Sequence, residues 1–402
     1  MRTRYGVPPW LEATSRPPSY PRFRGDRTAD VVVIGAGITG SAIAQACAAA
    51  GFDTLVLEAG RVGHGATSRS SGLLSTEPGP SFMEVVAAHG LRDARRVFDI
   101  WRRGALDGAA TLRRLRINCQ LQVRDAMIIA RGDEERDLRR DYDARREAGL
   151  DASWQTARHV NARMKLDQFA GVRLRAGATL DPYKACLGLA SAAVRAGAAC
   201  CEGSPVRKVR FSRKYADVVT ASGTIRTACV VVATGTATAE FKQLRRHFKH
   251  RETYFTMTEP VPGAVRRQLG DPGVVLADVS SPPHTIRWVG TDRLLVGGAD
   301  QDETAIRTRS AVLVQRTGQL MYQLLTMYPA ITGLQPAFGW EAAYGIPADG
   351  LMYIGAHRNY PHHFFALGGP ASITGAFVAA RMLIRELQGK AEKADEVFGW
   401  NR

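Results

Sequence analysis

The chain has 402 residues, of which 45% are hydrophobic, so it can bury a large core and is long enough for two domains. It lacks both an apolar run of the about eighteen residues that cross a bilayer and the apolar segment of a secretory signal, so we expect a soluble, cytoplasmic protein. The net charge of +16 suits an anionic partner, but the arginine-rich stretches are typical of solvated helix faces. These stretches lack aromatic residues spaced for base stacking, which disfavours nucleic-acid binding.

The first predicted elements are a strand, a turn and a helix. A β-branched run at 31–34 predicts a strand buried on both faces, and the motif GAGITG interrupts it. In such a turn Gly35 allows the backbone to reverse, Gly37 lets the main chain approach a pyrophosphate, and Gly40 lets the next helix pack closely on the strand. That helix is expected at 38–50. This order of elements favours a dinucleotide site over a glycine turn without a ligand.

A second buried strand is expected at 54–58, and it ends in Glu58. This acid lies about 20 residues beyond the turn, where a carboxylate can accept hydrogen bonds from ribose hydroxyls. The next segment, GRVGHGATSRSSGLLSTEPGPSF, is rich in Gly, Ser and Pro and too long for a simple connection. We therefore expect this loop to be functional.

The rest of the chain alternates between helical and strand-like stretches. We expect helix at 82–116, a strand at 120–130, helix again to 168, a helix from Asp181 to Gly197, a hairpin leading into a buried strand at 229–233, and short strands at 254–340 interrupted by a helix at 308–328. The strand at 229–233 ends on Thr234 and Gly235. We expect a second turn that faces the pyrophosphate there.

Several segments follow one another in a characteristic order. They are the opening βαβ unit, GATSRSSGLL, DPYKACLGLASAAVRAGA, VVVATG, DRLLVGGAD and the closing DGLMYIGAHRNYPHHFFALGGPASITGAFVAARMLIREL. In this order they resemble the D-amino acid oxidase-like (DAO) family of FAD-dependent oxidoreductases, which includes glycine and sarcosine oxidases. The resemblance implies an α/β fold: a discontinuous Rossmann-like FAD-binding domain (1–88, 175–240 and 340–402) and an inserted α+β substrate domain on a mixed sheet (89–174 and 241–339).

The resemblance also implies which residues hold FAD. Glu58 would contact the adenosine ribose, and Val206 would offer a main-chain group near the adenine. A helix that opens at residue 373 would aim its free N–H groups at the flavin and stabilise negative charge on the reduced ring. The full expected set is Gly35, Gly37, Ile38, Thr39, Gly40, Glu58, Ala59, Gly65, Ala66, Thr67, Ser68, Val206, Thr234, Gly235, Gly368, Gly369, Ile373 and Thr374.

The sequence departs from the family pattern at three places. The motif GGPASIT has Pro370 and Ser372 where permissive glycines are usual, and proline has no N–H to offer. The segment WEAAYGIPADG lacks the cysteine of members with covalently attached flavin, so we expect non-covalent FAD. Leu295 stands where related oxidases have a lysine that assists the reaction with oxygen, which favours a dehydrogenase or a slow oxidase.

Four residues are candidates for substrate chemistry. His284 could orient or deprotonate an amine, or it could be a surface or packing histidine. Arg287 and Arg69 could clamp a carboxylate through paired hydrogen bonds, although in a regular strand Arg287 points to the face opposite His284. Tyr344 and Trp340 could form a wall of the substrate cavity, or they could belong to the core.

No metal site is expected. His362 and His363 precede an apolar strand, are expected in a turn, and have alternating orientations that do not imply a metal pair. The six cysteines show no CxxC spacing and are expected to be reduced thiols.

The family implies an enzyme that removes a hydride from the carbon next to a nitrogen, giving an imine that water hydrolyses. The substrate would be an amino acid or a secondary amine, and the electron acceptor oxygen or a quinone. Two alternatives remain open. The chain could be an FAD-binding structural or partner subunit whose altered turn has lost catalysis, or a basic nucleic-acid binder with a vestigial nucleotide fold.

Overall fold

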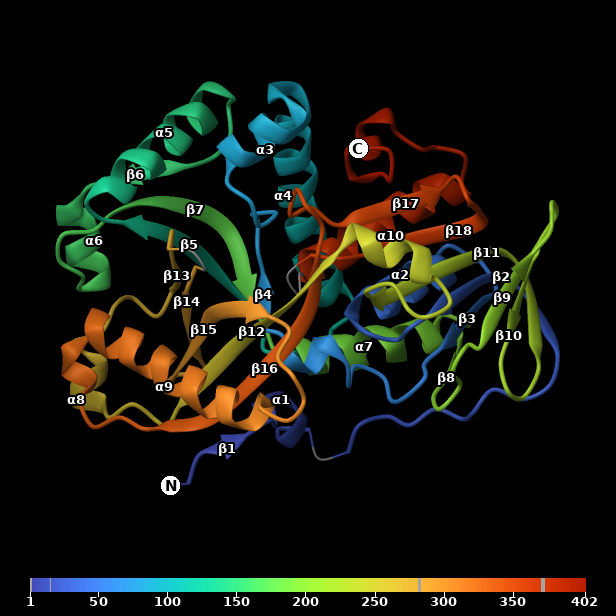
Figure 1. The fold of residues 1–402 in the computed structure, drawn as a ribbon, viewed down its shortest axis with the longest axis horizontal. Coiled ribbons are helices and arrows are strands. Elements are labelled where there is room, and N and C mark those ends of the chain that lie inside the picture. The colour runs from blue at the N-terminus through green and yellow to red at the C-terminus, as the bar shows by residue number, and fades with distance from the viewer. Residues whose placement is uncertain (1, 15, 281–282, 370–372) are drawn as a thin grey trace.

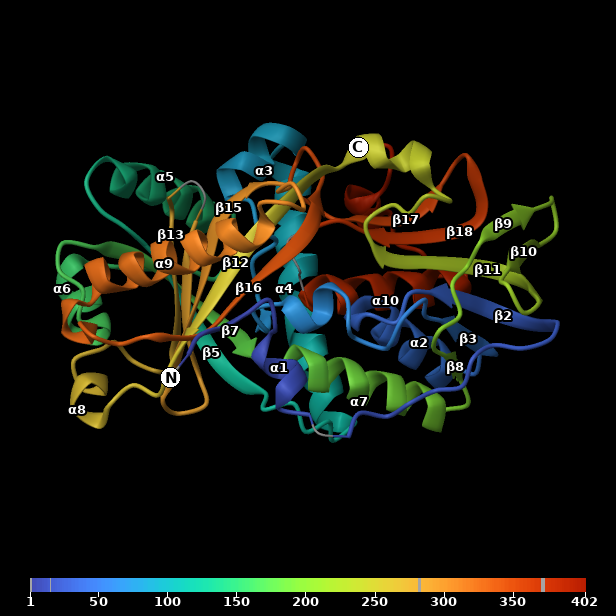
Figure 2. The ribbon, with the colours of Figure 1, turned by 60° about the horizontal axis from the view of Figure 1, so that its bottom comes forward.

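Two mixed β-sheets with their helices make up the fold in this computed structural model, which describes residues 2–14, 16–280, 283–369 and 373–402. In Figure 1 the ten-stranded sheet lies on the left and the eight-stranded sheet on the right, and Figure 2 shows both from another side. The predicted α/β class with a mixed second sheet is confirmed.

The eight-stranded sheet contains the opening βαβ unit. Its strand order is β17 (Tyr353–His357), β18 (Tyr360–Leu367), β11 (Thr224–Gly235), β2 (Arg27–Ile34), β3 (Thr54–Leu57) and β8 (Ala199–Cys201), with β10 (Ala216–Val219) and β9 (Lys208–Phe211) continuing from β11. The strands from β18 to β8 are parallel. Val31, Val32 and Val33 have no exposed surface, as expected for a strand covered on both faces.

One face of this sheet carries α2 (Ile38–Ala49), α7 (Pro182–Arg195) and α10 (Ile373–Leu387), which lie side by side in Figure 2. Against α10 packs α4 (Leu91–Arg114), which follows α3 (Phe82–His89). An added Cβ at Gly104 of α4 would lie 2.4 Å from the Cγ2 of Val378 in α10. The two helices therefore approach as closely as glycine allows.

The ten-stranded sheet forms the other half of the molecule. Its strand order is β1 (Arg4–Tyr5), β16 (Pro336–Ile346), β12 (Lys249–Thr258), β15 (Arg293–Asp302), β14 (Thr285–Val289), β13 (Val274–Asp278), β5 (Gln122–Ala130), β7 (Ala170–Thr179) and β4 (Leu73–Leu74), with β6 (Ser153–Gln155) on β7. The shorter elements and remaining helices are α1 (Pro9–Glu12), η1 (Ala66–Arg69), α5 (Asp133–Glu147), α6 (Ala157–Met164), η2 (Lys242–His247), α8 (Gly263–Arg266), α9 (Arg309–Met327), η3 (Pro329–Ile331) and η4 (Lys393–Phe398).

Most predicted elements are found within a few residues of the expected bounds, including α2, α7, α9 and the hairpin β10–β11. Three details were wrong. The expected helix at 82–116 breaks at Gly90, whose φ is +79°. The helix expected to reach 168 is divided by β6 into α5 and α6. His362 and His363 are not turn residues, because both lie in β18, where His363 has 3% of its surface exposed.

Two of the four predicted domain boundaries fall inside strands of the ten-stranded sheet, and a third falls inside α3. β7 and β16 cross the boundaries at 174 and 339, and β1 and β4 come from the segment expected in the FAD-binding domain. The division into domains therefore stays a proposal.

Among the described residues, no helix is long and apolar enough to cross a membrane. The same part of the chain also contains no group of three His, Cys, Asp or Glu side chains that could hold a metal ion.

Candidate active site

A cavity of about 560 Å³ lies at the carboxyl ends of β2, β3 and β11 and reaches the end of β16. This edge is where open sheets with parallel strands bind their ligands, and the volume lies within the range of about 300 to 1,000 Å³ typical of small-molecule sites. Residues of both sheets line the cavity, so a ligand in it would contact both halves of the molecule.

The glycine turn forms one wall of the cavity. Gly35 has a φ of +97°, and a Cβ there would lie 2.8 Å from the Ala233 carbonyl oxygen. A Cβ at Gly40 would lie 1.9 Å from the Gly35 carbonyl oxygen, so α2 can pack on β2 only with glycine at this position. Gly37 begins α2 without a side-chain cap, and a Cβ there would lie 3.1 Å from the Thr67 Oγ1.

Glu58 lies at the end of β3 and lines the cavity. Its Oε2 accepts a hydrogen bond from the main-chain N–H of Ala36 in the glycine turn at 2.8 Å, and its Oε1 accepts one from Gly60 at 2.8 Å. The loop that follows is also tied to the turn, because the Thr67 Oγ1 accepts a hydrogen bond from the Ile38 N–H at 2.9 Å. The fold therefore brings the turn, the acid and the loop to one place.

All but three of the residues expected to hold the cofactor line this cavity. The three exceptions are Gly40, inside α2, Ser68, which donates to the carbonyls of His64 and Gly65, and Thr374, which donates to the carbonyl of Ser75. The cavity-lining members are Gly35, Gly37, Ile38, Thr39, Glu58, Ala59, Gly65, Ala66, Thr67, Val206, Thr234, Gly235, Gly368, Gly369 and Ile373. Their individual contacts with a cofactor stay predictions.

Sequence reasoning missed another stretch of the wall. Thr236, Thr238, Ala239, Glu240 and Phe241 line the cavity directly after β11. The sequence feature that could have indicated them is the turn expected after Thr234 and Gly235, because the residues that follow such a turn lie at the same edge of the sheet. Other missed residues, from the end of β16 and its surroundings, are Ala343, Gly345, Met352 and Ala366.

Tyr344 is the one catalytic candidate that lines the cavity. Its hydroxyl donates a hydrogen bond to the carboxylate of Asp300 in β15. Burial, together with the negative charge of Asp300, raises the pKa of Tyr344, so its hydroxyl stays protonated at neutral pH. Asp300 itself was not expected from the sequence.

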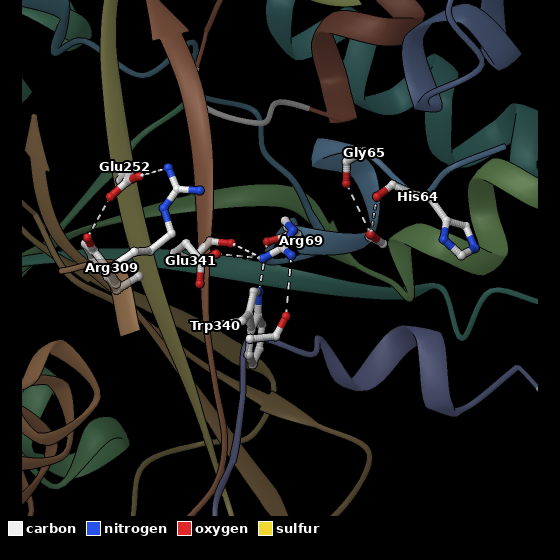
Figure 3. A network of polar contacts seen from close by, with 10 residues as sticks. His64, Gly65, Arg69, Glu252, Arg309, Trp340 and Glu341 are labelled. Carbon is white, nitrogen blue, oxygen red and sulfur yellow. Dashed lines mark hydrogen bonds and ion pairs between the residues drawn. The ribbon is translucent and has the colours of Figure 1, made fainter. Parts of the chain in front are cut away.

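Arg69 ends η1, beside β16, and does not line the cavity wall. Figure 3 shows its guanidinium beside Glu341, where Nη1 donates to the Glu341 carbonyl at 2.9 Å and to its Oε1 at 3.2 Å. Nη2 donates to the Gly6 carbonyl at 3.4 Å, and the Trp340 indole N–H donates to the Arg69 carbonyl at 3.0 Å. Trp340 is fully buried and stacks on Phe255, so it belongs to the core.

Arg287 is buried and its guanidinium is committed to main-chain carbonyls. Nε donates to Ser71 at 2.7 Å, Nη1 to Trp288 at 3.2 Å and Nη2 to Leu180 at 3.5 Å. Burial lowers the pKa of Arg287 to about 9, which still leaves a cation at neutral pH. Arg287 is not part of the cavity wall, so its role as a carboxylate clamp stays a prediction.

His284 lies just before β14 and is also outside the cavity wall. Its Nδ1 lies 3.0 Å from the Oδ2 of Asp278 and 3.1 Å from the Oγ of Ser280. Burial alone would raise the pKa of Asp278, but hydrogen bonds from His284 and Ser280 lower it below its usual value. The imidazole is thus anchored within its own turn, and its catalytic role stays a prediction.

The remaining departures from the family pattern lie in different settings. Leu295 is buried in β15, pairs with Met257 and belongs to the core. Pro370 and Ser372 fall outside the described residues. None of the described residues that line the cavity is a lysine or a cysteine.

The DAO family model, described as FAD dependent oxidoreductase, matches residues 30–386. The chain belongs to this family. The resemblance expected from the sequence is therefore confirmed, and this DAO-family chain is an FAD-dependent oxidoreductase.

Relatives of this DAO-family chain cover nearly its full length. It is 24% identical over 378 residues to the gamma-glutamylputrescine oxidoreductase of Escherichia coli (strain K12), which covers 92% of this chain and 85% of that protein. Glycine oxidase from Geobacillus kaustophilus has a TM-score of 0.75 at 20% identity and covers 93% of this chain and 99% of its own. L-proline dehydrogenase from P. horikoshii has a TM-score of 0.75 at 17% identity and covers 93% of this chain and 97% of its own. The two structures show that the fold is shared.

The cavity of this DAO-family chain fits FAD. Gly37 at the start of α2 has no side chain that would keep a pyrophosphate from the main chain, and helix N-termini favour such anions, although the Ile38 N–H is already bonded to Thr67. Glu58 stands beside this turn, where a ribose would lie. The residues present thus suit the pyrophosphate and the adenosine ribose of an adenine dinucleotide, and the cavity continues from there to Tyr344.

Proposed function

We propose that this protein binds FAD non-covalently in the cavity and oxidises a C–N bond of an amine or amino acid. The observation that carries the proposal is a single cavity that joins the glycine turn to Tyr344. The names of the relatives, an amine oxidoreductase and oxidases or dehydrogenases of amino acids, support the choice of substrate. The lack of cysteine among the described residues lining the cavity supports non-covalent binding.

When bound, FAD supplies an acceptor for the hydride that leaves the carbon next to nitrogen. The protein holds the cofactor through the main chain of the turn and loop, and positions the substrate at the end of β16, where Tyr344 offers a polar group.

We further propose that oxygen reoxidises the reduced flavin of the protein slowly. Leu295 provides no cation, no lysine appears among the described residues lining the cavity, and Arg287 is committed to three carbonyls. A cytoplasmic location is part of the same proposal.

The test begins with purified protein. It should be yellow, and acid precipitation should release the flavin into the supernatant. An anaerobic screen of amino acids and N-methyl amines should then find substrates that bleach the flavin. Bound flavin that no substrate bleaches would instead favour a catalytically impaired structural or partner subunit.

Stopped-flow mixing tests the electron acceptor. Substrate-reduced protein should reoxidise much faster with a quinone or an artificial acceptor than with aerated buffer. Reoxidation by oxygen as fast as substrate reduction would contradict the dehydrogenase assignment and place the protein with the oxidases.

A further inference from the structure

Tyr344 contributes an acceptor to the cavity rather than a donor. A phenol has one proton, and that of Tyr344 is given to the Asp300 carboxylate. The lone pairs of the phenol oxygen remain for a ligand. A group with an N–H can bind there, whereas a carboxylate, which only accepts hydrogen bonds, cannot pair with this oxygen.

The Asp300 carboxylate is not neutralised by the nearest arginine. Arg251 lies opposite Tyr344 on the neighbouring strand, and its Nη2 donates at 3.2 Å to the main-chain carbonyl of Asp300, not to its side chain. In the part of the chain that the structure describes, no ion pair involves the Asp300 carboxylate. This end of the cavity therefore carries an acidic pair, Tyr344 and Asp300.

The two arginines that were expected to clamp a substrate carboxylate, Arg69 and Arg287, are engaged elsewhere. Arg69 donates to Glu341 and Gly6, and Arg287 donates to three main-chain carbonyls. Among the described residues, Arg207 is the only cationic residue that lines the cavity, and it lies three residues after Ser204, whose N–H donates to the Glu58 carbonyl at 2.8 Å. No cation therefore lines the cavity at Tyr344: Arg251 lies opposite Tyr344 on β12, and its charge acts on the phenol, but it is not among the residues that line the wall.

We infer that Tyr344 and Asp300 bind the amine nitrogen of the substrate and select amines whose reacting carbon bears no carboxylate. The substrate N–H donates to the Tyr344 oxygen, while Asp300 orients the phenol and adds the negative charge that attracts an ammonium group. An α-amino acid would bring its carboxylate close to Asp300, where like charges repel. This inference rests on the proposed function and narrows it to amines.

The first experiment uses two ligands that cannot be oxidised, because their carbon next to nitrogen carries no hydrogen. tert-Butylamine and 2-aminoisobutyrate are nearly isosteric and differ by a methyl group in place of a carboxylate. Binding to the FAD-loaded protein is measured by calorimetry and by the flavin difference spectrum. tert-Butylamine should bind at least about tenfold more tightly. Equal binding, tighter binding of 2-aminoisobutyrate, or no binding of either ligand would contradict the inference.

Two variants test the residues. Asp300→Asn keeps an acceptor for the Tyr344 proton but removes the charge, and Tyr344→Phe removes the oxygen. Each should weaken tert-butylamine binding about tenfold, the size expected of a hydrogen bond to a charged group. Asp300→Asn also removes the charge that repels a carboxylate, so it should reduce the preference for tert-butylamine over 2-aminoisobutyrate further. Tyr322→Phe on α9, whose side chain is 70% exposed, is the matched control and should change neither value. If both Asp300→Asn and Tyr344→Phe bind tert-butylamine as the unaltered protein does, the inference is wrong.

Arg251→Lys tests the alternative that Arg251 binds a substrate carboxylate at this end of the cavity. The buried Nε of Arg251 has no hydrogen-bond partner, so this arginine is the group nearest Tyr344 that could still bind a carboxylate. The variant should leave the preference for tert-butylamine intact. If the unaltered protein prefers 2-aminoisobutyrate and Arg251→Lys abolishes that preference, the site recognises amino acids.

A turnover measurement separates this inference from the proposed function. Anaerobic flavin reduction is compared for 1-aminobutane, N-methylbutylamine and the corresponding amino acids, 2-aminopentanoate and its N-methyl derivative. Faster reduction by the amines at equal concentration is the expected result. Reduction by the amino acids alone would overturn the inference and keep the proposed function, whereas bound flavin that neither series reduces would count against both.

Discussion

The Glu58 end of the cavity is built from main chain, whereas the Tyr344 end is built from side chains of another sheet. At the first end, Gly35 and Gly37 bring backbone atoms to the surface, and Glu58 is fixed by two N–H groups of the chain. At the second end, Tyr344 from β16 meets Asp300 from β15. The first arrangement comes from one βαβ unit, and the second depends on how two strands of the ten-stranded sheet pair with β12 between them.

This difference has a consequence for chemistry. Main-chain geometry is shared by all members with the same turn, so the Glu58 end can recognise the same part of a cofactor throughout the family. Side chains change without disturbing a strand, so the Tyr344 end can differ from relative to relative. Substitutions at the first end should therefore act on folding and cofactor binding, and those at the second on substrate preference.

The largest effect is expected at Gly40. In Gly40→Ala the new Cβ would meet the Gly35 carbonyl oxygen at 1.9 Å, which forces α2 away from β2. Overpacking of this kind should cost more than about 3 kcal/mol of the free energy of unfolding and abolish FAD binding. Thermal and urea unfolding measure the loss. The control is Gly318→Ala in α9, where a Cβ has open space, which should stabilise by about 0.5–1 kcal/mol.

Arg287→Met should have the next largest effect and tests whether Arg287 acts on the fold or on the substrate. Three main-chain carbonyls lose their donor, which should reduce the free energy of unfolding by about 3 kcal/mol, while the KM for an amine substrate stays unchanged. The control is Arg136→Met in α5, whose side chain is 83% exposed and should cost less than about 0.5 kcal/mol. A raised KM with little loss of stability would show instead that Arg287 contacts the substrate.

Gly37→Val should separate cofactor binding from folding. Its Cβ would approach Thr67 Oγ1 to 3.1 Å, a distance that a small shift relieves, but the side chain would stand between the main chain and the pyrophosphate. We expect an intact fold by circular dichroism and more than about tenfold weaker FAD binding by fluorescence titration. Full retention of FAD would mean that the cofactor does not approach the main chain here.

The smallest effect concerns the pH dependence of stability. His363 is buried among Phe211, Phe241, Tyr360 and Phe365, and burial lowers its pKa below 6.5. The unfolded chain then binds more protons below pH 6.5, so the free energy of unfolding falls as the pH drops below this value. In His363→Phe this fall should be smaller, as urea unfolding between pH 7 and pH 5 can measure. An unchanged slope would assign the effect to other groups.

Much of the Glu58 end could be predicted from the sequence because its signals are local. A buried strand, a glycine turn, an alanine-rich helix and an acid at the end of the next strand lie within one short segment, and each has a backbone reason for its residue type. The same holds for the start of α7, where the Asp181 side chain accepts hydrogen bonds from the N–H groups of Tyr183 and Lys184. Such features need no knowledge of distant contacts.

The tertiary structure alone decided which side chains share the Tyr344 end. Arg69, Arg287 and His284 have suitable chemistry, but the sequence does not state that Glu341, the Ser71 carbonyl and Asp278 take up their hydrogen bonds. The pairing of Tyr344 with Asp300 joins residues 44 positions apart. A polar side chain binds whichever partner the fold brings within about 3 Å, and that partner is set by strand register and packing far from the residue itself.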